Sequence, residues 1–269
     1  MNARANAKLN LTLVVGARGP GGRHEVATVM EPLKLADKLA MHEGQGLVVE
    51  GFANDKLVRD ALELLARAAG VKAWWHVTIE KAIPVAAGLG GGSSDAAAAL
   101  RLANDTLERR LGEDALHALA ARLGADVPFF LTRGPKLALA DGTDLRPLDL
   151  PRDHTVLLLL PNGVSKPSTG AVYEAFDARG GAVGYGQRRA QLLEALEHVR
   201  TSADLAMLPP NDLASSPLAG LVAAAGAFRA DVTGAGPVVY GLFHDLPSAE
   251  DAGSELRIHG RVLITQPAW

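Results

Sequence analysis

The sequence contains no cysteine. Disulfide bonds, thiol nucleophiles and zinc sites with cysteine ligands are therefore excluded. A basic surplus is also absent: 27 Lys and Arg stand against 30 Asp and Glu, for a net charge of -3, whereas general nucleic-acid binders usually carry excess positive charge. No apolar run approaches the roughly 18 residues that span a bilayer, and the apolar stretch 11–15 is too short for a signal peptide. We expect a cytoplasmic protein that binds neither nucleic acid nor membrane.

The 269 residues are 48% hydrophobic and 21% charged, which suits one large domain or two ordinary ones with a buried core. The eight histidines are scattered without metal-ligand spacing, so we expect no protein-bound zinc. Alternating apolar residues predict strands, and a helical apolar spacing predicts helices. The expected strands cover 9–13, 75–79, 136–140, 156–160, 238–243 and 262–265, and the expected helices 56–69, 95–104, 113–123, 187–200 and 248–256. This α+β pattern has a soft boundary near residue 147, which predicts domains 1–147 and 148–269.

The most informative segment, residues 84–95, reads Pro-Val-Ala-Ala-Gly-Leu-Gly-Gly-Gly-Ser-Ser-Asp. Its four glycines permit positive φ and a close approach of backbone to ligand, and we expect both properties at Gly91. Ser93 and Ser94 are expected to cap the following helix or to donate hydroxyls to an anion, beside helix-terminal N–H groups that favour phosphate. The loop lacks the lysine of a Walker A loop and the third glycine of a dinucleotide fingerprint. A flexible linker or a tight helix-entry turn is the alternative, but the flanking strand and helix and the two serines favour a phosphate loop.

This segment resembles the ATP loop of the GHMP small-molecule kinases. The form Gly-Leu-Gly-Gly-Gly-Ser-Ser is similar to the branch that phosphorylates 4-diphosphocytidyl-2-C-methyl-D-erythritol in the non-mevalonate isoprenoid pathway. Four further segments carry the resemblance in family order: residues 5–10, 22–25, 123–130 and 233–237. Weaker similarity occurs at 163–173 and 211–213. The resemblance implies the two-domain GHMP-kinase fold, with a ribosomal-protein-S5-like N-terminal domain and a ferredoxin-like C-terminal domain.

The resemblance also implies roles for individual residues. Asp126 becomes the catalytic base, and Lys8 the catalytic lysine that pairs with it and orients the substrate hydroxyl. The implied ATP-binding residues are Lys81, Pro84, Gly88, Leu89, Gly90, Gly91, Gly92, Ser93, Ser94, Thr233, Gly234 and Gly236. The implied substrate-binding residues are Asn10, Arg23, His24, Thr169 and Tyr173.

Two positions depart from the family pattern. Arg23 stands where the family has a tyrosine that stacks on cytosine. The Asn-Leu pair of the family's adenine pocket is replaced by Asp55-Lys56 or displaced to Asn54. Both departures leave base recognition open in the sequence.

Read without the resemblance, Asp126 is a turn residue that ends a helix, Lys8 an edge-strand lysine in solvent, and 233–236 a turn into a strand. The resemblance implies a kinase that uses ATP with its accompanying Mg²⁺, acts on a cytidine-diphosphate-linked polyol, and is a monomer or homodimer. Two rivals remain: another GHMP kinase acting on a sugar, a mevalonate-type alcohol or homoserine, and a nucleotide-binding homologue without catalysis. His24 and residues 124–129 oppose the first, which Arg23 keeps open, and the joint presence of Lys8 and Asp126 opposes the second.

Overall fold

The computed structural model describes residues 1–52, 56–164 and 168–269, so Asn54 and Asp55 of the predicted adenine pocket lie outside the described residues. The chain folds into two compact units. Unit 1 comprises residues 1–7, 35–85 and 90–133, and unit 2 comprises residues 8–34, 86–89 and 134–269. These units interleave along the sequence because two long strands pass from one to the other, whereas the predicted boundary near residue 147 is a single cut. The predicted division into 1–147 and 148–269 therefore stays a prediction.

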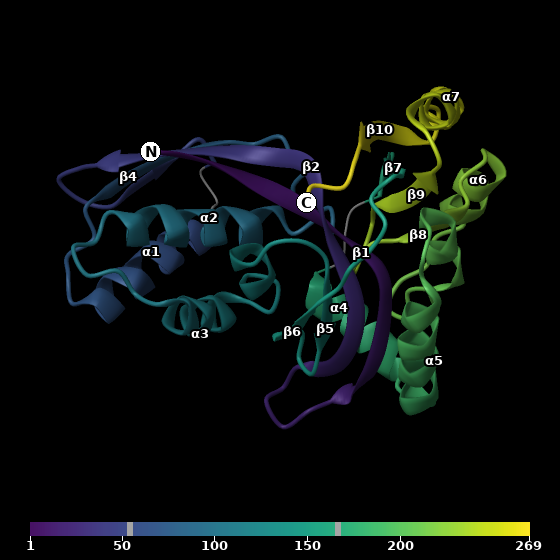
Figure 1. Cartoon of the computed structure of the whole chain (residues 1–269), viewed down its shortest axis with the longest axis horizontal. Coiled ribbons are helices and arrows are strands. Elements are labelled where there is room, and N and C mark those ends of the chain that lie inside the picture. The colour runs from purple at the N-terminus through teal and green to yellow at the C-terminus, as the bar shows by residue number, and fades with distance from the viewer. Residues whose placement is uncertain (53–55, 165–167) are drawn as a thin grey trace. The chain divides into compact units, whose positions relative to one another are not determined.

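Runs of strands and runs of helices follow one another along the described chain, and most of the strand pairs are antiparallel, as expected for the predicted α+β class (Figure 1). The strands are β1 (Asn2–Arg18), β2 (His24–Glu43), β3 (Val48–Glu50), β4 (Trp75–Glu80), β5 (Lys136–Leu139), β6 (Asp144–Pro147), β7 (Thr155–Pro161), β8 (Arg229–Val232), β9 (Val239–Phe243) and β10 (Gly260–Thr265). The α-helices are α1 (Lys56–Ala69), α2 (Gly91–Asp105), α3 (Glu113–Leu123), α4 (Thr169–Ala178), α5 (Tyr185–His198), α6 (Leu218–Ala224) and α7 (Leu246–Leu256). The described residues also form two 3₁₀ helices, η1 (Pro128–Leu131) and η2 (Ser202–Met207). Within the described ranges, no helix is both long and apolar enough to cross a membrane.

Unit 1 consists of strands covered by helices. The C-terminal part of β2 pairs antiparallel with β4, from Lys38 opposite Glu80 onward, and β4 pairs parallel with β3. Helices α1 and α2 pack side by side, with α3 against α1 (Figure 1). Residues 96–99 of α2 are four fully buried alanines, and their small side chains let the backbone of α2 approach its neighbours closely. That packing holds the N-terminus of α2, where the glycine-rich segment enters, in place.

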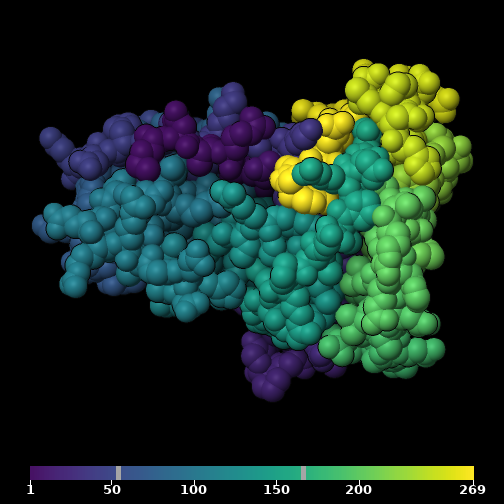
Figure 2. All heavy atoms as spheres, viewed as in Figure 1, coloured from purple at the N-terminus to yellow at the C-terminus, as the bar shows by residue number. Residues whose placement is uncertain are grey.

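Unit 2 contains a four-stranded antiparallel sheet in the order β10-β7-β9-β8. Helices α6 and α7 pack on it (Figure 1), and its core joins Leu157 and Phe243 to Leu256 of α7. In the same unit, the N-terminal part of β2 pairs with β5, and β5 pairs with β6. The space-filling view shows α5 as an exposed green ridge (Figure 2), and Leu192 is its one buried residue.

The elements match the sequence-based expectations unevenly. The helices expected at 56–69 and 113–123 are confirmed, residue for residue, as α1 and α3. The first strand runs over 17 residues rather than over 9–13, and the 20-residue β2 was not expected at all. Most of the middle of β2 is buried at consecutive positions, so its sequence lacks the alternation of apolar and polar residues that marks a half-buried strand. The short elements β3, β6, β8, α4 and α6 also escaped the sequence patterns.

Candidate functional site

The glycine-rich segment turns into α2 earlier than its sequence indicates. Gly88 and Gly90 have left-handed backbones, with φ of 82° and 70°, and Gly90 is the residue before the first turn of α2. Gly91 is already helical, so the expectation of positive φ at Gly91 is wrong. Glycine is favoured at this position for lack of room, because a Cβ on Gly91 would lie 3.1 Å from Ile83 Cγ2.

Ser93 and Ser94 lie inside the first turn of α2 rather than at its cap. The helix begins at Gly91 with no side-chain cap, so the expectation that these serines cap it is wrong. The Ser94 N–H donates to Gly90 O over 2.9 Å, and Ser94 is buried. The N–H groups that precede it have no partner within the helix and carry the positive end of the helix dipole. Space for a ligand exists at Gly92, where a Cβ would meet no described atom within 4 Å.

Lys81 in unit 1 is held between two buried carboxylates. Its Nζ donates to Asp37 Oδ2 at 2.5 Å and to Asp95 Oδ2 at 2.6 Å, and both aspartate side chains are fully buried. Burial alone would lower the pKa of Lys81, but its hydrogen bonds to Asp37 and Asp95 and their negative charges outweigh burial and raise it. Asp37 Oδ1 also accepts the N–H groups of Ala82 and Ile83 at 2.6 and 2.8 Å. This ion cluster therefore fixes the start of the glycine-rich segment, and sequence analysis missed both aspartates.

Lys8 and Asn10 form a buried polar pair on β1 in unit 2. They are two residues apart and so share one face of the strand, and the Lys8 ammonium donates to Asn10 Oδ1. Asn10 Nδ2 donates to Thr28 Oγ1 at 2.8 Å, and the Asn10 N–H donates to Thr233 Oγ1 at 2.9 Å. Both Lys8 and Asn10 are only 4% exposed. The reading of Lys8 as an edge-strand lysine in solvent is therefore wrong.

The C-terminal glycine turn lies directly against Gly88. A Cβ on Gly88 would lie 2.7 Å from Thr233 O and 3.2 Å from Gly236 O. A Cβ on Gly234, whose φ is 57°, would lie 3.2 Å from Asn10 Oδ1 and 3.6 Å from Lys8 Nζ. Unit 2 thus brings Lys8, Asn10, Gly88 and the turn 233–236 together in one compact group. A side chain at Gly88 would clash with backbone, and one at Gly234 would be strained. Leu89 contributes through its backbone, since the Lys8 N–H donates to Leu89 O at 2.9 Å.

Asp126 lies in unit 1, in the turn between α3 and η1, and is half-buried. The next four residues are buried, and Arg101 of α2 donates to Phe130 O at 2.8 Å, which ties η1 to α2. Lys8 belongs to unit 2, so its pairing with Asp126 stays a prediction. Across the described residues, no group of three or more His, Asp or Glu side chains is arranged to hold a metal ion.

The predicted cytidine-binding residues divide into a pair and two outliers. His24 stacks on Tyr173, with ring centroids 4.6 Å apart and planes at 27°, and its Nε2 is hydrogen-bonded to Asp177 Oδ1 at 2.8 Å. Arg23 instead forms a 3.0 Å ion pair with Asp141 at the surface. Thr169 is exposed at the start of α4, one turn before Tyr173. Sequence analysis missed Asp177, which lies one helical turn beyond Tyr173 on α4.

Comparison with known proteins assigns the chain to a family. The family model described as "GHMP kinases N terminal domain" matches residues 56–134. The chain is 37% identical to the 4-diphosphocytidyl-2-C-methyl-D-erythritol kinase of Pelotomaculum thermopropionicum, in an alignment that covers 99% of this chain and 97% of that protein. Near-complete coverage at this identity means that the two proteins share their whole fold.

Solved structures agree with this assignment. A 4-(cytidine 5'-diphospho)-2C-methyl-D-erythritol kinase matches with a TM-score of 0.80 at 31% identity, covering 100% of both chains. The mevalonate kinase of Methanococcus jannaschii matches with a TM-score of 0.77 at 12% identity, covering 100% of this chain and 98% of that one, which shows the fold alone. The expected GHMP-kinase fold is therefore confirmed. The chain belongs to the GHMP kinases and, within them, to the 4-diphosphocytidyl-2-C-methyl-D-erythritol kinase family.

Proposed function

We propose that this protein transfers the γ-phosphoryl group of ATP to the 2-hydroxyl of 4-diphosphocytidyl-2-C-methyl-D-erythritol. One observation carries the proposal. In a chain of this family, the buried Lys8 and Asn10 lie beside the turn 233–236, and the backbone of this turn packs closely against Gly88 of the glycine-rich segment. The ammonium of Lys8 is the cation of this group: it donates to Asn10 Oδ1, and it lies beside Gly234, which brings no side chain to the group. Phosphoryl transfer needs such a preset cation beside phosphate-binding backbone.

Each group has a distinct task in the proposed reaction. The N–H groups of the first turn of α2 bind phosphate oxygens. Lys8 stabilises the charge on the transferred phosphoryl group and orients the substrate hydroxyl, and Asn10 contacts the erythritol portion of the substrate. Asp126 accepts the proton of that hydroxyl as it attacks. Mg²⁺ carried by ATP supplies further charge neutralisation when bound.

The cytidine end of the substrate would be read by His24 and Tyr173. Asp177 holds the His24 ring through Nε2, which leaves Nδ1 as the ring atom for the base. Because Arg23 is engaged by Asp141 at the surface, we propose that Tyr173 supplies the stacking that the family shares between two aromatic residues. We further propose a cytoplasmic enzyme that works as a monomer or homodimer.

Two alternatives are weaker. The mevalonate kinase of Methanococcus jannaschii resembles this chain at 12% identity, which supports a common fold but no common substrate. The joint presence of Lys8 and Asp126 opposes a homologue without catalysis, because these are the two residues that the proposed reaction needs for charge stabilisation and proton transfer. The cytidine-linked alcohol therefore remains the best-supported substrate.

The test is ADP release with a panel of alcohols: the cytidine-linked methylerythritol, mevalonate, homoserine and galactose. We expect turnover with the first alone, and ³¹P NMR of the product should show a new phosphomonoester at the 2-position. Asp126→Ala should lower kcat by about 10²–10⁴-fold and leave the Kd for ATP nearly unchanged. Turnover with another alcohol would refute the substrate, and a folded Asp126→Ala enzyme with more than a tenth of wild-type kcat would refute the base.

A further inference from the structure

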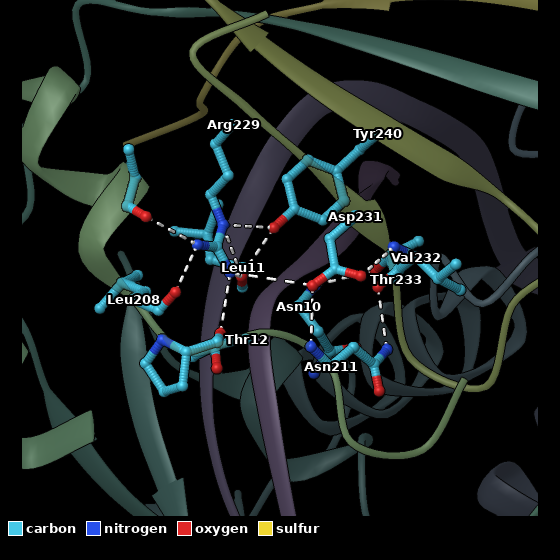
Figure 3. A network of polar contacts seen from close by, with 12 residues as sticks. Asn10, Leu11, Thr12, Leu208, Asn211, Arg229, Asp231, Val232, Thr233 and Tyr240 are labelled. Carbon is cyan, nitrogen blue, oxygen red and sulfur yellow. Dashed lines mark hydrogen bonds and ion pairs between the residues drawn. The ribbon is translucent and has the colours of Figure 1, made fainter. Parts of the chain in front are cut away.

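Arg229, on β8, is a buried arginine whose partners are mostly backbone carbonyls (Figure 3). Its Nε and Nη2 donate to Leu11 O at 3.0 and 2.6 Å. Its Nη1 donates to Leu208 O at 2.6 Å, and its Nη2 also donates to Pro209 O at 2.9 Å. The ion pair with Asp231 is long, at 3.9 Å. A buried guanidinium bound in this way joins separate chain segments rather than neutralising one acid.

Tyr240 of β9 completes the arrangement around Leu11. Its hydroxyl accepts from Arg229 Nε at 2.7 Å and donates to Leu11 O at 2.7 Å. Tyr240 is fully buried, and burial raises the pKa of its hydroxyl, so the group remains a neutral donor. The Leu11 carbonyl thus receives three hydrogen bonds from two side chains of one sheet. This is an unusually strong hold on a single point of β1.

That point adjoins the residues of the proposed site. Asn10 lies one residue before Leu11. Its N–H donates to Thr233 Oγ1, and its Oδ1 accepts a hydrogen bond from the Lys8 ammonium. From the other side, Asn211 Nδ2 donates to Val232 O at 2.9 Å (Figure 3). The same Nδ2 also donates to Gly234 O at 2.7 Å. The Asn211 N–H in turn donates to Asp231 Oδ2 at 2.8 Å. One continuous network therefore fixes both β1 and the turn 233–236.

We infer that Arg229 is a positioning residue for phosphoryl transfer: it sets the position of β1, which carries Lys8 and Asn10, against the turn 233–236. The inference rests on the proposed function. Misplacement of reacting groups by about 1 Å can cost about 10²-fold in rate. The Arg229 guanidinium bonds β1 and the segment 208–209 at once, so its loss should displace β1 and lower kcat. Lysine cannot replace it, because an ammonium lacks the planar set of donors that reaches both segments.

The test uses variants of graded severity. Tyr240→Phe removes one donor to Leu11 O and leaves no buried charge unpaired, and Arg229→Lys keeps the charge but loses the fork. We expect kcat to fall about fivefold or more in the first and further in the second, per folded enzyme. The matched control is Val222→Ala, which opens a void in the core under the same sheet and removes none of the hydrogen bonds of the network. It should lower Tm by a similar amount while kcat stays within about twofold of wild type.

A double-mutant cycle separates positioning from plain stability. If Tyr240 and Arg229 act through Asn10, the effect of Tyr240→Phe on kcat/KM should largely vanish in an Asn10→Ala background, because coupled residues are not additive. Val222→Ala should remain additive in that background. The inference would be overturned if Tyr240→Phe lowered kcat/KM by the same factor with and without Asn10→Ala. It would also be overturned if Tyr240→Phe and Arg229→Lys lowered Tm without lowering kcat. A wild-type enzyme without turnover on the panel would instead sink the proposed function, so the two failures are distinguishable.

Discussion

Gly88→Ala tests the contact between the two glycine segments most directly. Gly88 has a φ of 82°, and an added Cβ would lie 2.7 Å from Thr233 O, inside any normal contact distance. A left-handed backbone costs an L-residue about 1–2 kcal/mol, and overpacking in a well-packed region costs about 1–3 kcal/mol. The structure therefore predicts a loss of about 2–5 kcal/mol of unfolding free energy. The turn 233–236 must also shift, so kcat and the affinity for ATP should both fall.

Thermal unfolding and ADP-release kinetics measure the two effects separately. For a chain of this size, each kcal/mol lowers Tm by about 2–4 °C, so Tm should fall by about 4–20 °C. Gly92→Ala is the matched control for the fold, because a Cβ there meets no described atom within 4 Å. Gly92 lies in α2, so its replacement by alanine should leave stability unchanged or raise it by up to about 1 kcal/mol. An unchanged Tm and an unchanged KM for ATP in Gly88→Ala would refute the close contact of the two segments.

Three further predictions concern charged and ionisable groups. Lys81→Met leaves two buried carboxylates without their cation, so the free energy of unfolding measured in urea at pH 7 should fall by about 3–5 kcal/mol. Because the pKa of Lys81 is raised in the folded protein, the stability that Lys81 contributes should persist up to its ordinary pKa and decrease above it; a decrease already near neutral pH would contradict the cluster. Burial, followed by the charge of Glu25, raises the pKa of Tyr185 to about 12, so absorbance at 295 nm should show no ionisation of Tyr185 near pH 10 in the folded protein. The stability that Tyr185 contributes should be lost as pH rises from 10 towards 12, and Glu25→Gln should lower the pKa of Tyr185. Arg23→Ala breaks a surface ion pair worth about 0–1 kcal/mol and should change kcat/KM less than about fivefold, whereas a larger fall that depends on salt would mean that Arg23 binds the substrate.

Much of the proposed chemistry could be predicted from the sequence because it depends on local patterns. The glycine-rich segment identifies itself through four glycines and two serines within a dozen residues, and such a loop binds phosphate by its own backbone. Helices α1 and α3 could be located because each carries a complete apolar face. The family could be recognised because its short motifs keep their order along the chain.

Only the tertiary structure decided which side chains meet. Lys81 lies between Asp37 and Asp95, which are 44 and 14 residues away, and Arg229 reaches Leu11 across 218 residues. Such partners leave no periodic trace, because each is chosen where strands and turns cross in space rather than by spacing along the chain. Strand β2 escaped prediction for the same reason: its burial on both faces is imposed by neighbours distant in sequence. Lys8 is the clearest case, since its type and motif were evident from the sequence, while its burial against Asn10 and Gly234 required the folded arrangement of β1 and the turn 233–236.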